Sequence, residues 1–214
     1  DCSNNPRLGN QVNIIGSINV FEAALEVKSK LVVYTSSGGV YGQKDKINPF
    51  PETHYGAYKL AIEGIARAYY LENKLNSFGL RPFVVFGPGR EIGGTASISI
   101  ACKAVAEDKE YKIEFGGKAG FVYVEDIAEI IIKILEDLPN GARVMNINGI
   151  TEDVSKIVEF LNTFTTFRKI TYNKKNLPIV GEILGNGPEE HLKNFDYTDI
   201  KNGLKKTISY YRNF

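Results

Sequence analysis

Apolar residues follow two different spacings along this chain, and the alternation of the two predicts an α/β protein. Residues 31–34 and 80–86 form almost unbroken apolar runs, which are typical of strands buried on both faces of a parallel sheet. Residues 12–27 and 56–75 instead have the character of helices, with apolar positions recurring at helical spacing in the first of them. Strands that alternate with helices predict a parallel sheet covered by helices.

The alternation continues to the end of the chain. The polar opening, residues 1–11, is predicted to be a loop, and glycine, proline and charge predict another loop at 174–194. Asp126 is predicted to cap a helix that ends near Leu138. The remaining expected segments are a loop and helix at 93–108, a short strand and turn at 111–120, a strand at 142–147, a turn at 148–149, a helix at 153–164 and an amphipathic helix at 197–213.

The stretch from Lys30 to Glu63 carries the candidate chemistry. Ser37 follows the apolar strand, at the carboxyl end where open parallel sheets collect ligands. Tyr55 and Lys59 stand four residues apart at the start of a helix, so their side chains share one face. A free phenol titrates near ~10, and a positive charge beside it favours the phenolate. The pattern therefore indicates proton exchange between Tyr55 and a substrate hydroxyl or carbonyl, with Ser37 holding the same oxygen.

These residues and three further motifs resemble the short-chain dehydrogenase/reductase superfamily, in its extended branch of NAD-dependent epimerases and dehydratases. The motifs are TSSGGVYG at 35–42, LRPFVVFGPG at 80–89 and FVYVEDIAE at 121–129, in family order. The resemblance implies a doubly wound, Rossmann-like parallel sheet with a small C-terminal α/β substrate lobe. A second Tyr-x-x-x-Lys, at Tyr70 and Lys74, has no strand-end serine before it, so we interpret it as a surface pair.

The resemblance also implies roles for individual residues. Asn13 would support the active-site geometry, although an asparagine at this place also fits a helix cap. The catalytic residues implied are Ser37, Tyr55 and Lys59. The implied cofactor contacts, for NAD with NADP left open, are Asn13, Ser36, Tyr55, Lys59, Pro82, Phe83 and Val84. The implied substrate contacts are Ser37, Gly38, Gly39, Arg90 and Lys118.

The chain departs from the family pattern at positions that decide the substrate. Gly38 and Gly39 stand where the dehydratases carry an Asp-Glu pair, which disfavours water elimination. Val84 replaces an asparagine that binds the substrate diphosphate in many epimerases. Ala119 and Gly120 stand where relatives often place a phosphate-binding arginine, which leaves Arg90 and Lys118 as the expected phosphate contacts.

The composition limits the kinds of partner, cellular location and metal site that we expect. The 214 residues include 26 basic and 25 acidic ones, a balance that gives no reason to expect nucleic acid or a membrane surface as a partner. The apolar runs are broken by charges, and no secretory signal is visible, so a cytoplasmic location is expected. Two cysteines and two histidines give neither a disulfide framework nor zinc-ligand spacing.

The chain begins at Asp1 and contains no glycine-rich dinucleotide turn of the family's spacing. We therefore expect on the order of 50 to 80 residues to be missing upstream, the length of two βαβ units that share a strand. Residues 1–90 would be the remainder of the dinucleotide-binding domain, and 91–214 the substrate lobe, with 121–148 returning to the first domain.

The function favoured by the sequence is epimerisation of a sugar, in the first place a nucleotide sugar, by transient hydride transfer to bound NAD. The alternatives are a dehydrogenase or reductase acting on another hydroxy or keto compound, and a catalytically silent fragment that serves as a dimerising module. Homodimerisation through helices 12–27 and 56–75 is expected from the resemblance.

Overall fold

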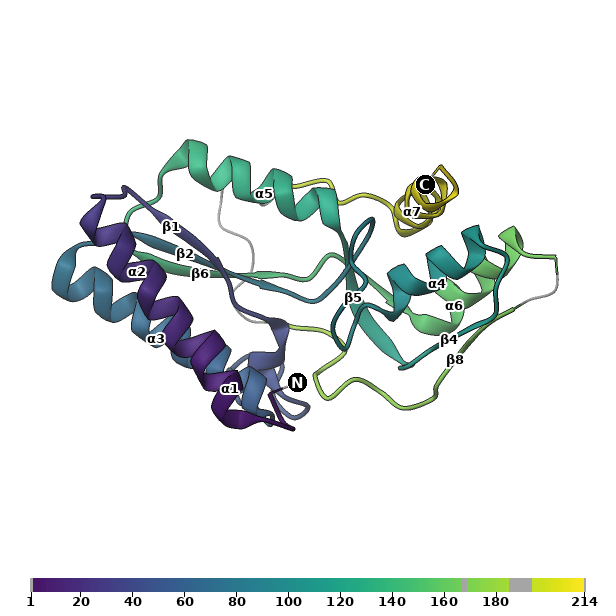
Figure 1. Ribbon diagram of the computed structural model, residues 1–214, viewed down its shortest axis with the longest axis horizontal. Helices are drawn as coiled ribbons and strands as arrows, with labels where there is room; N and C mark the ends of the chain where they lie inside the picture. The colour runs from purple at the N-terminus through teal and green to yellow at the C-terminus, as the bar shows by residue number, and fades with distance from the viewer. Residues whose placement is uncertain (1, 167–168, 185–193, 214) are drawn as a thin grey trace. The chain divides into compact units, whose positions relative to one another are not determined.

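The computed structural model describes residues 2–166, 169–184 and 194–213, which fall into two compact units (Figure 1). Unit 1 comprises Asp1–Pro82, Glu129–Ile147 and Pro178–Lys193, and unit 2 comprises Phe83–Ala128, Asn148–Leu177 and Asn194–Phe214. The division predicted from the sequence assigns dinucleotide binding to one domain and substrate binding to the other, and this assignment stays a prediction. Within the described residues no helix combines the length and the hydropathy needed to cross a membrane.

Unit 1 is built on a parallel sheet, as the apolar runs predict. Its strands are β1 (Val32–Thr35), β2 (Ser77–Pro82) and β6 (Ala142–Ile147), in the order β1-β2-β6. Helices α2 (Gly16–Glu26) and α3 (His54–Asn73) cover one face, and the part of α5 that belongs to unit 1 covers the other (Figure 1). The predicted α/β class with a parallel sheet is confirmed.

The first helix starts earlier than expected, so the predicted loop at 1–11 is wrong for most of its length. The helical stretch runs from Pro6 through α1 (Pro6–Asn10) and a π-helical turn at Gln11–Ile15 into α2. Asn5 caps it by accepting a hydrogen bond from the Leu8 N–H at 3.1 Å. Proline suits the first position of a helix because its missing N–H has no intrahelical partner there. The Asn-Pro pair was thus a helix start rather than a loop signal.

The apolar run at 80–86 is two strands instead of one. Strand β2 ends at Pro82 in the sheet of unit 1, and β3 (Val84–Phe86) pairs with β5 (Lys118–Tyr123) in unit 2. Both pieces are largely buried, so hydropathy alone gave no sign of the break.

Unit 2 holds a mixed sheet in the order β3-β5-β7 and a two-stranded parallel sheet of β4 and β8. Strand β7 lies at Ile150–Asp153, within residues expected to turn directly into a helix, and it runs antiparallel to β5. The remaining elements are β4 (Tyr111–Ile113), β8 (Ile170–Tyr172), α4 (Ser97–Ala106), α6 (Val154–Leu161), a 3-10 turn at Asn162–Phe164 and α7 (Ile200–Arg212). The expected loop at 174–194 lies partly outside the described residues.

Asp126 does not cap a helix, which corrects the prediction. Helix α5 (Val124–Asp137) begins two residues earlier, and Asp126 is buried in its first turn. Its carboxylate accepts hydrogen bonds from the N–H and the hydroxyl of Thr198, at 3.0 Å and 2.6 Å. Asp126 therefore holds the segment that leads into α7.

Candidate active site

Ser37 lies directly after β1 and organises the turn that follows. Its Oγ accepts a hydrogen bond from the Gly39 N–H at 3.0 Å, which caps the 3-10 turn at Gly38–Tyr41. Among the described residues no acceptor takes the proton of the Ser37 hydroxyl. That hydrogen can therefore be donated to the oxygen of a ligand at the carboxyl end of β1.

Helix α3 packs closely on this turn because its third residue is a glycine. A Cβ on Gly56 would lie 2.3 Å from the carbonyl oxygen of Gly39, far inside contact distance. Thr53 caps the helix by accepting from the Gly56 N–H at 3.0 Å. This close approach places Tyr55 beside Ser37: a Cβ on Gly39 would lie 3.3 Å from Ser37 Oγ and 3.8 Å from Tyr55 Cδ1. Tyr55 remains 42% exposed.

Lys59 lies one helical turn beyond Tyr55 and is held at the same place. Its Nζ is 5.6 Å from the centroid of the Tyr55 ring and donates to the carbonyl oxygen of Thr35 at 2.8 Å. Burial lowers the pKa of Lys59, and the nearby Cys2 thiol opposes this shift. In the described part of the chain no carboxylate forms an ion pair with this ammonium. The structure thus groups Ser37, Tyr55 and Lys59 at the end of β1; their catalytic roles stay predictions.

The second Tyr-x-x-x-Lys shows how little the spacing alone decides. Lys74 Nζ lies 5.7 Å from the Tyr70 ring centroid, almost the same as in the first pair. Lys74, however, is the C-terminal cap of α3 and donates to the carbonyl oxygen of Leu71. What distinguishes Tyr55 is the strand-end serine beside it.

Asn13 sits inside the π-helical turn, so it is not a helix cap. Its side-chain amide donates to the Gly9 carbonyl oxygen at 2.9 Å and to Cys2 Sγ at 3.7 Å. Cys2 is also close enough to Lys59 to oppose the lowering of the lysine pKa by burial. Sequence reasoning did not single out Cys2 for the site, because a lone cysteine in a polar stretch carries no signal.

The other expected cofactor and substrate contacts belong partly to unit 1 and partly to unit 2. Ser36 is buried, and its hydroxyl donates to Glu63. Pro82 ends β2 in unit 1. Unit 2 holds the remaining four: Phe83 and Val84 are buried, Lys118 is exposed on β5, and Arg90 donates to the carbonyl oxygen of Ile92 at 2.5 Å.

Known proteins resemble this chain over most of its length. An uncharacterised 37.6 kDa protein from Escherichia coli O111:H- is 28% identical, over 98% of this chain and 71% of its own. A probable UDP-glucuronate 4-epimerase from Rhizobium meliloti is 26% identical over 73% of this chain, which spans about half (48%) of that enzyme.

A solved structure of UDP-glucose 4-epimerase from Thermotoga maritima with UDP-glucose aligns with a TM-score of 0.84 and 24% identity. The alignment covers 99% of this chain and 73% of that one. This likeness confirms the predicted Rossmann-like fold. A sequence profile of the NAD-dependent epimerase/dehydratase family matches residues 1–148. The chain belongs to this family of enzymes, whose cofactor is NAD.

Proposed function

We propose that this chain carries the catalytic residues of a nucleotide-sugar 4-epimerase. The observation that supports it most is the grouping of Ser37, Tyr55 and Lys59 at the carboxyl end of β1. When bound, NAD would supply a reversible hydride acceptor for the carbon that bears the reacting hydroxyl.

Each of the three residues has a distinct task in this proposal. The Tyr55 phenolate takes the proton of the sugar hydroxyl as the C–H bond breaks, and gives it back when the hydroxyl is restored. Lys59 keeps a positive charge near the phenolate and so favours the ionised phenol. Ser37 donates its hydroxyl hydrogen to the same sugar oxygen, in both the alcohol and the ketone.

The side chains at this site fit the nicotinamide-ribose end of NAD. Lys59 uses one of its three N–H donors on the Thr35 carbonyl oxygen, which leaves donors for ribose hydroxyls. Gly39 leaves open the space beside Ser37 and Tyr55 that a Cβ would fill. We propose that Lys59 and Tyr55 hold the ribose, with Asn13 and Ser36 supporting the site and Pro82, Phe83 and Val84 near the nicotinamide amide.

The substrate proposal rests on charge and on relatives. The Rhizobium meliloti relative is named a probable UDP-glucuronate 4-epimerase, and a UDP-sugar carries a diphosphate that needs donors. Val84 and Ala119 are buried in the apolar core of unit 2 and offer none. Arg90 and Lys118 are the proposed phosphate contacts, and Ser37, Gly38 and Gly39 the proposed sugar contacts.

A net dehydrogenase of another hydroxy compound is the second candidate, and burial of Val84 favours it because the usual diphosphate contact is missing. Gly38 and Gly39 continue to disfavour a dehydratase. A cytoplasmic location and a silent, dimerising role for this chain remain sequence-based expectations.

A substrate screen of the complete protein separates the two candidates. UDP-sugars should be converted to C4 epimers without release of NADH. Arg90→Ala should raise their KM about tenfold to a hundredfold, because charge-assisted phosphate contacts contribute roughly 1.5–3 kcal/mol each. Oxidation of unphosphorylated compounds with stoichiometric NADH would instead establish the dehydrogenase.

A homodimer through the N-terminal helices is the proposed assembly. Val12 and Val20 are 65% and 58% exposed on the first helical stretch, and Leu71 is exposed on α3. Replacing Val12 and Val20 together with lysine should raise the dimer Kd about tenfold or more, measured by sedimentation. Ile92→Lys, at an exposed residue of unit 2, serves as the control. Equal behaviour of the two variants would contradict this interface.

A further inference from the structure

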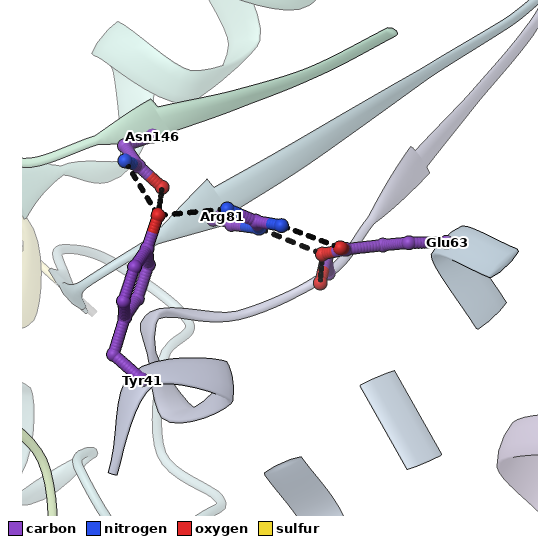
Figure 2. Close-up of polar contacts among 5 residues, drawn as sticks. Tyr41, Glu63, Arg81 and Asn146 are labelled. Atoms are coloured by element: carbon purple, nitrogen blue, oxygen red, sulfur yellow. Dashed lines mark hydrogen bonds and ion pairs between the residues drawn. The ribbon is translucent and has the colours of Figure 1, made fainter. Parts of the chain in front are cut away.

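A buried ion pair lies behind the candidate site in unit 1. Arg81 on β2 and Glu63 on α3 are only 4% and 9% exposed. The guanidinium grips the carboxylate with two parallel hydrogen bonds, Nε to Oε1 at 2.8 Å and Nη2 to Oε2 at 2.6 Å. Figure 2 shows Arg81 between Glu63 and Tyr41.

Three more buried side chains extend this pair into a network. The Ser36 hydroxyl donates to Glu63 Oε1 at 2.5 Å, and Arg81 Nη1 donates to the Tyr41 hydroxyl at 2.7 Å. The Tyr41 hydroxyl accepts from Asn146 Nδ2 at 2.9 Å and lies 3.1 Å from Oδ1 of the same residue (Figure 2). The carboxylate of Glu63 thus accepts three hydrogen bonds. The network joins α3, β2, β6 and both ends of the turn that follows β1.

The members of the network are next to the candidate catalytic residues in the chain. Ser36 precedes Ser37, and Tyr41 ends the 3-10 turn that Ser37 caps. Glu63 lies one helical turn beyond Lys59 and two beyond Tyr55, so these three side chains occupy one face of α3. A change in the position of Glu63 therefore moves the elements that carry the site.

Stability alone does not account for this pair. Withdrawing two charges from water costs several kcal/mol per ion, and apolar replacements of a whole buried pair are often neutral or stabilising. Glu63 also has another natural partner, since Lys59 stands four residues before it, at ion-pair spacing. In the structure Arg81 and Ser36 donate hydrogen bonds to the Glu63 carboxylate instead. Lys59 donates to the carbonyl oxygen of Thr35.

We propose that Arg81 and Glu63 are positioning residues for the site: their pairing fixes the end of β1 against α3 and keeps the Glu63 carboxylate away from Lys59. The Lys59 ammonium can then interact with Tyr55 and the cofactor. The proposal rests on the proposed function of Ser37, Tyr55 and Lys59, but its geometric part is independent of the substrate.

The test compares Arg81→Met with the double variant Glu63→Gln/Arg81→Met in the complete enzyme. Arg81→Met leaves a buried carboxylate unpaired, so its unfolding midpoint should fall and its kcat should drop about tenfold to a hundredfold, with KM nearly unchanged. The double variant removes the unpaired charge and should regain stability, yet kcat should stay at least about tenfold low because the site is no longer fixed. Glu129→Gln/Lys133→Met, at an exposed pair of α5 in unit 1, is the matched control.

A second readout does not need the substrate. The rate at which acetic anhydride labels Lys59, followed by mass spectrometry, reports how much of its amine is unprotonated. In Arg81→Met the freed carboxylate should raise the pKa of Lys59 and slow labelling by on the order of threefold to tenfold, while Lys74 is unchanged. The double variant should label at the original rate.

The two readouts separate the possible failures. Recovery of both stability and kcat in the double variant would overturn the positioning role and leave a structural ion pair. Unchanged labelling of Lys59 in Arg81→Met would overturn the claim that Arg81 keeps Glu63 from Lys59. If Arg81→Met does not fold, the kcat of the double variant alone decides. If the original enzyme turns over no sugar nucleotide, the proposed function fails, while labelling still tests the geometry.

Discussion

Tyr55→Phe should lower kcat by a factor of roughly 10² or more in the complete enzyme, the loss typical of a removed general base. The phenol lies beside Ser37 and one turn before Lys59, and phenylalanine keeps the ring while removing the proton acceptor. KM should change much less, because the ring and its neighbours remain. The measurement is steady-state turnover with the best substrate from the screen.

Tyr70→Phe is the matched control for this prediction. Tyr70 has the same spacing to Lys74 and almost the same distance between ring and ammonium, but it lies at the far end of α3. Its removal should leave kcat within about twofold, as expected of a group that transfers no proton. Equal losses of kcat in two folded variants would show that the strand-end serine does not identify the catalytic tyrosine.

Gly56→Ala should disrupt the site far more than the same change at Gly64, the other glycine of α3. The new Cβ would lie 2.3 Å from the Gly39 carbonyl oxygen, which is backbone and cannot rotate away. We expect the free energy of unfolding to fall by about 1–3 kcal/mol, as in other overpacked sites. Turnover should fall by about tenfold or more, because the first turn of α3 must move Tyr55 away from Ser37.

Gly64→Ala tests whether this effect is local. Gly64 lies in the middle of α3, and a Cβ there would meet no atom within 4 Å. Alanine should raise the free energy of unfolding by about 0.5–1 kcal/mol, since glycine is the weaker helix former. Thermal unfolding of both variants is the measurement, and a Gly56→Ala variant as stable as Gly64→Ala would contradict the close packing of α3 on the turn.

The grouping of Ser37, Tyr55 and Lys59 was predictable because it follows from two regular geometries. A serine after a buried parallel strand must lie at the carboxyl edge of the sheet, and residues four apart on a helix must share a face. The parallel sheet was predictable for a similar reason, since strands buried on both faces leave continuous apolar runs.

The network around Arg81 was not predictable in the same way. Glu63 and Arg81 lie on different elements, and in a sequence a buried charged residue looks the same as an exposed one. The break between β2 and β3 was missed because both strands are largely buried, so the apolar run continues across the boundary between the two units. Asp126 was misassigned because its partner, Thr198, lies 72 residues away.

Isotope retention at C4 tests the proposed epimerase most directly. The complete enzyme is incubated with UDP-glucuronic acid or UDP-glucose that carries deuterium at C4, and the products are examined by NMR while NADH is followed by absorbance. We expect the C4 epimer with its deuterium retained and no accumulation of NADH, because the hydride leaves and returns at one carbon. Accumulation of NADH carrying the deuterium, with a ketone as the product, would contradict it and identify a dehydrogenase.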